Sequence, residues 1–400
     1  MAINTYALKA ASSVAAFWDG ARFQAKSRLG LVSPPILLPY RGYVANGRMR
    51  FGGRVIEDEG IVDAPVSRSR WTNLKRSFRR YETDEIPDAI IEWKVLGLSG
   101  TTTSDTQGFF YVDIPIDEVP DGQAWIPVDM VLVSAPRYEF KPFENKTYVR
   151  VVSPDAAFGV VSDIDDTIVE TGARKLLRHW RTVAQNSAEG RVAFPGIDLF
   201  FQALTYGSRG EETNPFFYVS SSPWNLYDLF EDFMGLRGIP HGPMFLKDFG
   251  LTKTQWVSGS HSDHKLDAIK TILGAYPALD FVLIGDTGQS DAKIYAQAVV
   301  EHPGRIQAVF LRNVTPKGFR GGVQKAIDEI TRAGVPVVSG PTLNAAAQEA
   351  ENVGLVAPKT AERMDGKIAE DREQLKMSEL PRPTGLRRDR ADPGSQPKGD

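Results

Sequence analysis

The chain has 400 residues, of which 42% are hydrophobic and 24% are charged, and its net charge is −3. This length allows two domains and a tail, since single hydrophobic cores rarely exceed about 250–300 residues. The small net charge gives no basic field for nucleic acid, and the absence of cysteine excludes disulfides, zinc–thiolate sites and thiol catalysis.

The longest apolar runs are far shorter than the roughly 20 residues of a membrane span. The first residues, MAINTYALKAASSVAAFWDG, lack the charged start and continuous apolar core of a secretory signal. We therefore expect an intracellular, cytoplasmic protein, with the membrane surface as a peripheral alternative.

Residues 1–30 are predicted to form an N-terminal helix. Its apolar residues recur at spacings of three and four, at Ile3, Ala7, Ala10, Val14, Phe17 and Ala21. Packing on the body of the protein is the favoured role of this helix. Contact with a membrane surface and disorder are the two alternatives.

Residues 36–150 are predicted to form an all-β, sandwich-like domain. Short β-rich runs such as RMRFGGRVI and AIIEWKVLG alternate with clusters of Gly, Pro, Asp and Thr. The basic segment SRSRWTNLKRSFRRYETDE is expected to be an exposed loop or a short helix, and the alternative is a patch that contacts anionic lipid or another acidic partner.

Residues 155–354 are predicted to form an α/β domain with a doubly wound parallel sheet, because apolar runs alternate with helical patterns. The runs are Phe158–Val161, Phe216–Val219, Met244–Leu246, Phe281–Ile284, Ile306–Leu311 and Val335–Val338. Ligands of such sheets bind outside the carboxyl ends of the strands. Residues 355–400 are charged and poor in apolar residues, which predicts a disordered tail.

Three carboxylates, Asp163, Asp165 and Asp166, follow the first of these runs within four residues. Like charges repel by roughly 4 kcal/mol per pair at about 4 Å and an effective dielectric near 20. A cation is therefore expected at this strand end.

Other strand ends and helix starts carry Ser220-Ser221-Ser222, Lys265, and Asp286 with Asp291. Each has a purely structural alternative. The serines before Pro223 are typical of a helix start, an aspartate near a helix start complements the helix dipole, and a lysine is commonly a solvated surface residue.

The interpretation of Lys265 as a solvated surface lysine meets a conflict if Ser262 caps its helix. Lys265 would then lie in the first turn, where positive charge is disfavoured. A nearby anion would remove the conflict. A helix starting at Pro223 would also present free N–H groups to a phosphate. One side of the predicted pocket thus favours an anion and the other a cation, as in magnesium phosphate chemistry. The absence of cysteine and the scarcity of histidine argue against zinc.

The motifs D-x-D-x-T, Ser, Lys and G-D-x-x-x-x-D, in this order after strands, resemble the phosphatases of the haloacid-dehalogenase superfamily. More narrowly, DIDDTI, YVSSSPWNLY, HKLDAI and LIGDTGQSDAKIY resemble the actin-patch-associated phosphatidate phosphatase family over residues 155–315. The β-rich part before them also resembles the N-terminal region of that family. Residues 1–30 and the tail show no such resemblance.

The resemblance implies a role for each motif residue. Asp163 would be the nucleophile that forms an aspartyl-phosphate, and Asp165 would protonate the leaving oxygen and later deprotonate water. Thr167 would hold the loop and Asp165 in place. Ser220 and Lys265 would bind the phosphoryl oxygens.

The same resemblance implies a Mg²⁺ cofactor. Its ligands would be Asp163, the backbone carbonyl of Asp165, and Asp286, with Asp291 binding directly or through water. Asp166 fits the motif of the family but receives no separate role.

A large or membrane-borne phosphate ester is the expected substrate, because the segment after Thr167 is short for a domain that covers small metabolites. Candidate contacts to a lipid headgroup or surface are Lys175, Arg178, Arg181 and Lys247. Trp224 either lines the pocket or belongs to the core.

The leading hypothesis is a Mg²⁺-dependent phosphatase that converts phosphatidate to diacylglycerol and phosphate. Its first alternative is a phosphatase of a soluble phosphomonoester, such as a sugar or nucleotide phosphate. A second is glycosyl transfer, in which D-x-D also binds a metal; Thr167 and the later Gly285-Asp286 and Asp291 argue against it. A third is a non-catalytic lipid-binding or scaffold protein of the same fold.

The expected partners are a phosphomonoester and an anionic membrane surface, and no nucleic acid.

Overall fold

The structure is a computed structural model that describes residues 33–58, 84–165, 167–168, 195–210, 213–247, 261–288, 290–314, 319 and 321–379. Several predictions fall outside these residues: the helix of residues 1–30, the basic segment except its last two residues, Asp166, and the candidate contacts Lys175, Arg178 and Arg181. No helix among the described residues is long and apolar enough to cross a bilayer.

The first domain, called here the β-sheet domain, is built from seven strands. They are β1 (Pro35–Ala45), β2 (Arg48–Glu57), β3 (Ile90–Val95), β4 (Leu98–Thr103), β5 (Phe109–Pro115), β6 (Trp125–Ser134) and β7 (Phe143–Arg150). Along β3, exposed and buried residues alternate with the period of two that places every second side chain in a core. No helix interrupts the described residues between 33 and 158, as the β-rich prediction expects.

The seven strands form one sheet in the order β4-β3-β6-β7-β1-β2-β5. Every neighbouring pair is antiparallel except β1 and β7, which run parallel. The two outer strands, β4 and β5, approach each other. This is shown by a hydrogen bond from Thr102 Oγ1 of β4 to the carbonyl of Tyr111 of β5 at 3.2 Å. The sequence predicts a sandwich, which has two separate sheets; the structure has a single curved sheet instead.

The second domain, called here the parallel-sheet domain, contains six parallel strands. They are β8 (Gly159–Ser162), β9 (Phe216–Pro223), β10 (Met244–Lys247), β11 (Phe281–Asp286), β12 (Ile306–Arg312) and β13 (Val337–Gly340). Their order is β10-β9-β8-β11-β12-β13, with all neighbours parallel. The predicted doubly wound parallel sheet is thereby confirmed.

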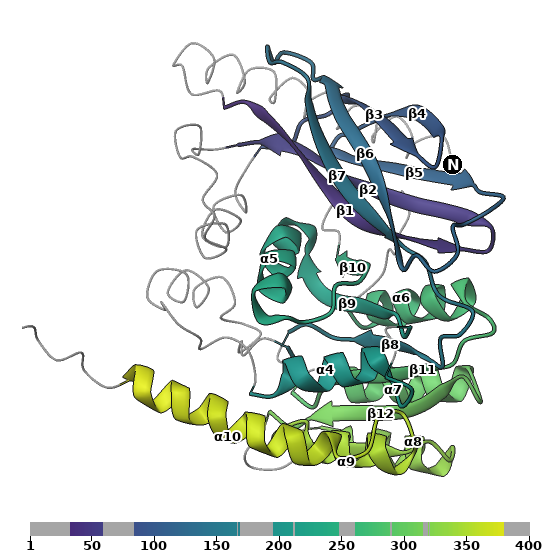
Figure 1. Cartoon of the computed structure of the whole chain (residues 1–400), viewed down its shortest axis with the longest axis vertical. Helices are drawn as coiled ribbons and strands as arrows, with labels where there is room; N and C mark the ends of the chain where they lie inside the picture. Colours follow the sequence, from purple (N-terminus) through teal and green to yellow (C-terminus); the bar gives the residue numbers. More distant parts are fainter. Residues whose placement is uncertain are drawn as a thin grey trace, which may run out of the picture.

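Helices cover both faces of this sheet (Figure 1). One face packs against α4 (Ile197–Tyr206), α5 (Tyr227–Arg237), α9 (Asn344–Asn352) and α10 (Thr360–Glu379), and the other against α6 (His261–Ala275), α7 (Asp291–Glu301) and α8 (Val323–Arg332). Consecutive strand residues supply opposite faces: Val160 and Phe216 join the first core, and Val161 and Phe217 the second. Continuous apolar runs are therefore required, because both faces are buried.

The prediction of a disordered tail from residue 355 is wrong for residues 360–379, which form α10. Ala361, Met364 and Ile368 lie at spacings of three and four and are buried in the core beneath α4 and α9. This apolar stripe is narrow and lies among many charged residues, so the composition of the segment hides it. Residues 380–400 lie outside the described part of the chain.

Strand β1 joins the two domains by packing its outer face on the parallel-sheet domain (Figure 1). The ring of Tyr40 stacks on Trp224 with centroids 4.6 Å apart, and the ring of Tyr43 lies 6.0 Å from that of Phe245. Both tyrosines are buried. The interface therefore has an aromatic centre and fixes the β-sheet domain against the segment that follows β9.

Candidate active site

The strand order reverses between β8 and β11, where ligands of open α/β sheets characteristically bind. Asp163 comes directly after β8, and Asp286 is the last residue of the neighbouring β11. The backbone N–H of Asp163 donates to the carbonyl of Ile284 at 2.8 Å, which fixes the two strand ends against each other. The predicted strand-end carboxylates therefore meet at the carboxyl edge of the sheet.

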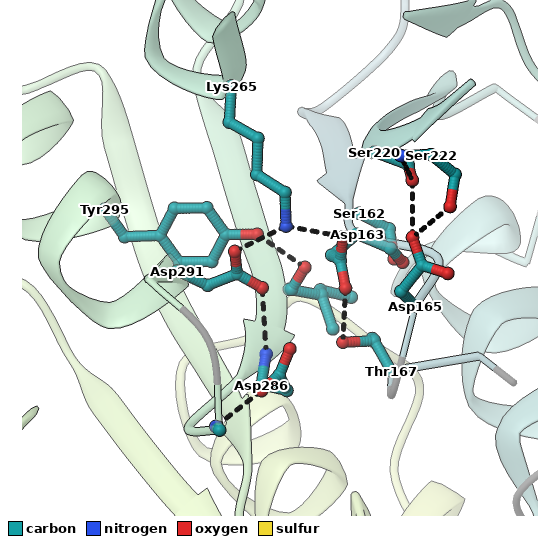
Figure 2. Close-up of polar contacts among 12 residues, drawn as sticks. Ser162, Asp163, Asp165, Thr167, Ser220, Ser222, Lys265, Asp286, Asp291 and Tyr295 are labelled. Carbon is teal, nitrogen blue, oxygen red and sulfur yellow. Dashed lines mark hydrogen bonds and ion pairs between the residues drawn. The ribbon is translucent and has the colours of Figure 1, made fainter. Parts of the chain in front are cut away.

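Asp163, Asp286 and Asp291 form a buried group, called here the carboxylate cluster. Each offers one oxygen, and these three oxygens lie within 4.8 Å of one another. Figure 2 shows the three side chains converging from β8, β11 and the start of α7. Hard oxygen donors of this kind suit Mg²⁺ and not a thiolate- or imidazole-preferring metal. The cluster fits the predicted magnesium site.

Lys265 provides the positive charge inside this cluster. Its Nζ lies 2.7 Å from Asp163 Oδ1 and 2.6 Å from Asp291 Oδ1, and the residue is only 3% exposed. The anions beside Lys265 are the carboxylates of Asp163 and Asp291, whereas the sequence analysis expects a phosphate there; its contact with phosphate stays a prediction. The expected position in the first turn is wrong, however, because α6 begins at His261 and Lys265 is its fifth residue.

Burial and charge together shift the pKa values of this group. Burial lowers the pKa of Lys265, but the carboxylates of Asp163 and Asp291 outweigh it and hold that pKa above its ordinary value. Burial raises the pKa of Asp163 well above its ordinary value, and Lys265 opposes this shift. A bound cation would lower the pKa of such a carboxyl further, since opposite charge favours the ionised form.

Asp165 lies beside the carboxylate cluster and is held by two serines. Ser220 Oγ and Ser222 Oγ both donate to Asp165 Oδ2, at 2.5 and 2.9 Å, and the N–H of Ser222 donates to Ser220 Oγ at 2.9 Å. Burial raises the pKa of Asp165, and the two serine hydrogen bonds partly counter this rise. A buried carboxyl with a raised pKa is suited to general acid–base chemistry.

Thr167 is predicted to hold the loop and Asp165. The structure shows a contact to the other aspartate: Thr167 Oγ1 donates to Asp163 Oδ2 at 3.3 Å. Thr167 therefore orients the first residue of the motif from within the loop, while the serines of β9 orient the third.

Gly285 allows α7 to approach the end of β11. A Cβ atom at this position would lie 2.7 Å from both Asp291 Oδ2 and Tyr295 Oη, closer than real Cβ contacts allow. Tyr295 donates its hydroxyl to the carbonyl of Ile284 at 2.8 Å, and the N–H of Asp286 donates to Asp291 Oδ2 at 3.2 Å. The glycine thus permits the contacts that bring Asp291 into the carboxylate cluster.

The segment after Ser222 differs from the prediction of a helix that starts at Pro223. Strand β9 continues through Pro223, a 3₁₀ turn follows over Trp224–Leu226, and α5 begins at Tyr227. Trp224 contacts the β-sheet domain through Tyr40. Lys247 pairs in register with Pro223, which places it at the same carboxyl edge as the serines.

Ser222 is a site residue that the sequence analysis takes only for a helix start. The signal was present in its spacing: residues two apart on a strand point to the same face, so Ser222 must share the face of Ser220. The contact of Arg54 with this segment had no signal in the sequence, because Arg54 belongs to the other domain: its Nη1 donates to Asn225 Oδ1 at 2.6 Å.

Residues 158–313 match the protein family described as phosphatidate phosphatase APP1, catalytic domain. This range holds Asp163, Asp165, Thr167, Ser220, Lys265, Asp286 and Asp291. The expected resemblance to this family is therefore confirmed over the part of the chain that carries the site.

Two curated yeast proteins are similar to the chain. Phosphatidate phosphatase APP1 of Saccharomyces cerevisiae is 28% identical over 211 residues, which are 52% of this chain and 34% of that protein. An uncharacterized protein of Schizosaccharomyces pombe is 24% identical over 232 residues, or 57% of this chain and 36% of that protein. The chain thus spans about a third of the length of these relatives.

Among solved structures, a carbohydrate acetylesterase from Xanthomonas citri aligns with 85% of this chain and 74% of its own. The sequence identity is 9% and the TM-score 0.30, which is too low to carry a conclusion about fold or function.

Proposed function

Since residues 158–313 match the family described as phosphatidate phosphatase APP1, catalytic domain, we propose that the protein is a Mg²⁺-dependent phosphatase that hydrolyses phosphatidate to diacylglycerol and phosphate. The observation that carries this proposal is the convergence of Asp163, Asp286, Asp291 and Lys265 beside Asp165 at the switch point of the parallel sheet. The proposed place of action is the cytoplasmic surface of a membrane, where phosphatidate is present.

Asp163 is the proposed nucleophile. Its carboxylate oxygen attacks phosphorus, the bond from phosphorus to the lipid oxygen breaks, and an aspartyl-phosphate forms on Asp163. Its burial supports this role, because a desolvated carboxylate is a stronger nucleophile than a hydrated one. Thr167, which donates to the other carboxylate oxygen of Asp163, keeps the attacking atom in place.

Asp165 is the proposed general acid and base. In the first step the protonated carboxyl gives its proton to the leaving lipid oxygen, which departs as the hydroxyl of diacylglycerol. In the second step the carboxylate accepts a proton from the water that attacks the aspartyl-phosphate, which releases phosphate and restores Asp163. The raised pKa of Asp165 supports the first role, and its hydrogen bonds from Ser220 and Ser222 support the second.

The carboxylate cluster would hold Mg²⁺, together with the backbone carbonyl of Asp165. When bound, the ion supplies positive charge between the anionic nucleophile and the anionic phosphate. The supporting observation is the donor set: three buried carboxylates offer oxygens within 4.8 Å of one another, and carboxylate oxygens are the ligands that Mg²⁺ prefers.

Lys265 and Ser220 are proposed to bind the oxygens of the transferring phosphoryl group. Both are buried; Lys265 contacts the carboxylate of Asp163 and Ser220 donates to that of Asp165. Donors that are already fixed in place stabilise developing charge without reorganisation. Lys247 lies at the carboxyl edge and is proposed as a contact for the headgroup.

The test is hydrolysis by the full chain. Phosphatidate in detergent mixed micelles is supplied with Mg²⁺ or with EDTA, and both phosphate and diacylglycerol are measured. We expect turnover with Mg²⁺ alone and a loss of at least about a thousandfold in Asp163→Asn, which removes the nucleophile. Asp129→Asn is the matched control, because Asp129 pairs with Lys146 on the surface of the β-sheet domain and is 59% exposed.

The same assay separates the alternatives. Faster hydrolysis of soluble sugar or nucleotide phosphates than of phosphatidate would assign the mechanism to another substrate. Binding of phosphatidate vesicles without any hydrolysis would indicate a non-catalytic lipid-binding protein. Full Mg²⁺-dependent activity in Asp163→Asn would refute the proposed mechanism.

A further inference from the structure

Residues 286–288, called here the β11 turn, carry Asp286, one member of the carboxylate cluster. Asp286 is the last residue of β11, and its Oδ1 accepts a hydrogen bond from the N–H of Gly288 at 2.5 Å. A bond of this kind, from the backbone to an aspartate two residues earlier, closes a compact turn. The carboxylate of Asp286 is therefore attached to the backbone of its own turn, and a displacement of the turn displaces the carboxylate.

Thr287, the middle residue of the β11 turn, binds this turn to the end of β12. Thr287 is completely buried, at 0% exposed. Its N–H donates to the carbonyl of Arg312, the last residue of β12, at 2.9 Å, and its hydroxyl donates to Asn313 Oδ1 at 3.1 Å. The same hydroxyl accepts a hydrogen bond from the N–H of Val314 at 3.4 Å. Thr287 therefore holds the segment after β12 with both its backbone and its side chain.

The β11 turn also packs directly on that segment. A Cβ atom at Gly288 would lie 2.3 Å from Val314 Cγ2 and 3.1 Å from Asp286 Oδ1, and the first of these distances is shorter than real Cβ contacts. Glycine thus permits this close approach, because it has no side chain. Packing and the hydrogen bonds of Thr287 therefore fix the same part of the chain.

Asn313 extends this support to β13. Its N–H donates to the carbonyl of Gly340, the last residue of β13, at 2.6 Å, while its side chain accepts the hydrogen bond from Thr287. Asn313 is the last residue of the range that matches the family, and Gly340 lies outside that range. The contacts that hold Asp286 therefore extend from β11 through the end of β12 to a strand beyond the matched part of the chain.

We propose that Thr287 and Asn313 are positioning residues of the metal site, whose shared hydrogen bond holds Asp286 in place and thereby sets the affinity for Mg²⁺. This inference rests on the magnesium site of the proposed function. Neither residue belongs to the carboxylate cluster, so both act through Asp286. Residues that hold a metal ligand from outside typically contribute about 10- to 100-fold to metal affinity or activity.

The experiment is isothermal titration calorimetry of the full chain with MgCl₂, after treatment with EDTA and dialysis. Thr287→Val keeps the shape of the side chain but removes its hydroxyl, and it is expected to weaken Mg²⁺ binding about 10- to 100-fold. Thr287→Ser keeps the hydroxyl and should bind Mg²⁺ like the unaltered protein. The two variants separate the hydrogen bond from the packing of the side chain, because each keeps one of the two.

Asn313→Ala removes the acceptor of the same hydrogen bond and is also expected to weaken Mg²⁺ binding. Adding it to Thr287→Val should cause little further loss, because two changes that remove one interaction are not additive. Losses that multiply in the double variant would overturn the shared hydrogen bond as the cause. Asn313 is only half-buried, so Asn313→Ala decides the question even if Thr287→Val fails to fold.

Thr205→Val is the matched control. Thr205 is 5% exposed in the same domain, and its hydroxyl donates to the carbonyl of Phe201 within α4 at 3.0 Å. The loss of this buried hydroxyl should leave the affinity for Mg²⁺ unchanged. Denaturant unfolding in EDTA gives the stability of each variant, so a residue with only a structural role is recognised by lower stability at unchanged affinity.

The inference is overturned if Thr287→Val and Asn313→Ala bind Mg²⁺ as tightly as the unaltered protein does. In that case the unaltered protein still binds the ion, and the proposed function stands. Absence of Mg²⁺ binding by the unaltered protein would instead refute the metal site of the proposed function, and this inference with it.

Discussion

The ammonium group of Lys265 lies 2.7 Å from the carboxylate of Asp163, although the two residues are 102 positions apart in the chain. The same ammonium contacts Asp291 at 2.6 Å, and all three side chains are buried. Lys265 thus places one positive charge in direct contact with two members of the carboxylate cluster. A buried charge that loses its partner costs about 3–5 kcal/mol of stability.

Lys265→Met is therefore expected to lower the free energy of unfolding in EDTA by about 3–5 kcal/mol. Mg²⁺ should restore part of this loss, because a divalent cation can replace the missing charge. The measurement is denaturant unfolding of Lys265→Met and of the unaltered protein, each with EDTA and with Mg²⁺. The increase in stability on adding Mg²⁺ should be larger in the variant than in the unaltered protein.

Lys270→Met is the control for this experiment. Lys270 lies on the same helix, is 38% exposed, and pairs with Glu301 on the surface. A surface pair contributes about 0–1 kcal/mol, so this variant should unfold almost like the unaltered protein. Equal stability of Lys265→Met and the unaltered protein in EDTA would show that the three carboxyls are not ionised together.

Ser222→Ala is expected to reduce kcat/KM about 10- to 100-fold, because it removes one of two hydrogen bonds to Asp165, and a bond to a charged group contributes about 1.5–3 kcal/mol. The hydrogen bonds of both serines lower the pKa of Asp165. Without Ser222 that pKa rises, so the alkaline fall of kcat/KM should move to higher pH. A serine with only a structural role would not move this profile.

The pH profile is measured on the same phosphatidate assay with saturating Mg²⁺. Ser153→Ala is the control, since Ser153 accepts a hydrogen bond from the N–H of Asp155 in an exposed turn outside the site. An unchanged pH profile together with unchanged kcat/KM in Ser222→Ala would exclude a role of this serine in positioning Asp165.

The convergence of the site was predictable because its residues follow strand ends. In a doubly wound sheet the carboxyl ends of all strands lie on one edge, so Asp163, Ser220 and Asp286 had to meet there. The argument for Lys265 from a first-turn position was wrong, since Lys265 is the fifth residue of α6, and its place in the motif order was the better signal. The family resemblance added the order of the motifs and the roles.

The parts that the sequence did not reveal depend on contacts between distant segments. The alternation of β1 shows which face is buried but not that Tyr40 packs on Trp224 of the other domain. The stripe of Ala361, Met364 and Ile368 is too narrow to identify α10 against its charged surroundings. One curved sheet and two stacked sheets likewise have the same local pattern, because both bury every second residue.

Arg54 connects the β-sheet domain to the active-site segment. It is 5% exposed and donates Nη1 to Asn225 at 2.6 Å, Nη2 to Glu85 at 2.8 Å and Nε to the carbonyl of Gln107 at 2.9 Å. Asn225 lies three residues after Ser222. We therefore expect Arg54 to help position the segment that carries the serines bound to Asp165.

Arg54→Lys is expected to lower kcat about tenfold to a hundredfold with little change in KM, because a lysine cannot reach all three acceptors and small displacements of reacting groups are costly. Steady-state kinetics on phosphatidate micelles measures both parameters. Arg48→Lys is the control on the same strand, where the arginine is 41% exposed and pairs with Asp113. A normal kcat in Arg54→Lys would show that the β-sheet domain does not position the site.

Because Tyr43 is buried between the two domains, its titration should make the stability of the protein depend on pH in the alkaline range. Burial raises the pKa of Tyr43 to about 12, and Arg50 opposes this shift. In the unfolded chain its pKa is about 10. Between about pH 10 and pH 12 the unfolded state loses this proton while the folded state keeps it, so stability falls as the pH rises. The loss due to this one residue approaches about 2–3 kcal/mol at pH 12.

Tyr43→Phe is expected to remove that contribution, because phenylalanine has no proton to lose. The free energy of unfolding, measured in denaturant at about pH 9 and about pH 11, should fall less in the variant than in the unaltered protein; about one pH unit of the shift corresponds to about 1.4 kcal/mol. Tyr206→Phe is the control, since this side chain is 44% exposed. Other buried tyrosines lower the alkaline stability of all three proteins alike, so only the difference between variants reports on Tyr43. An identical fall in Tyr43→Phe and the unaltered protein would mean that Tyr43 titrates in the folded protein as it does in the unfolded chain.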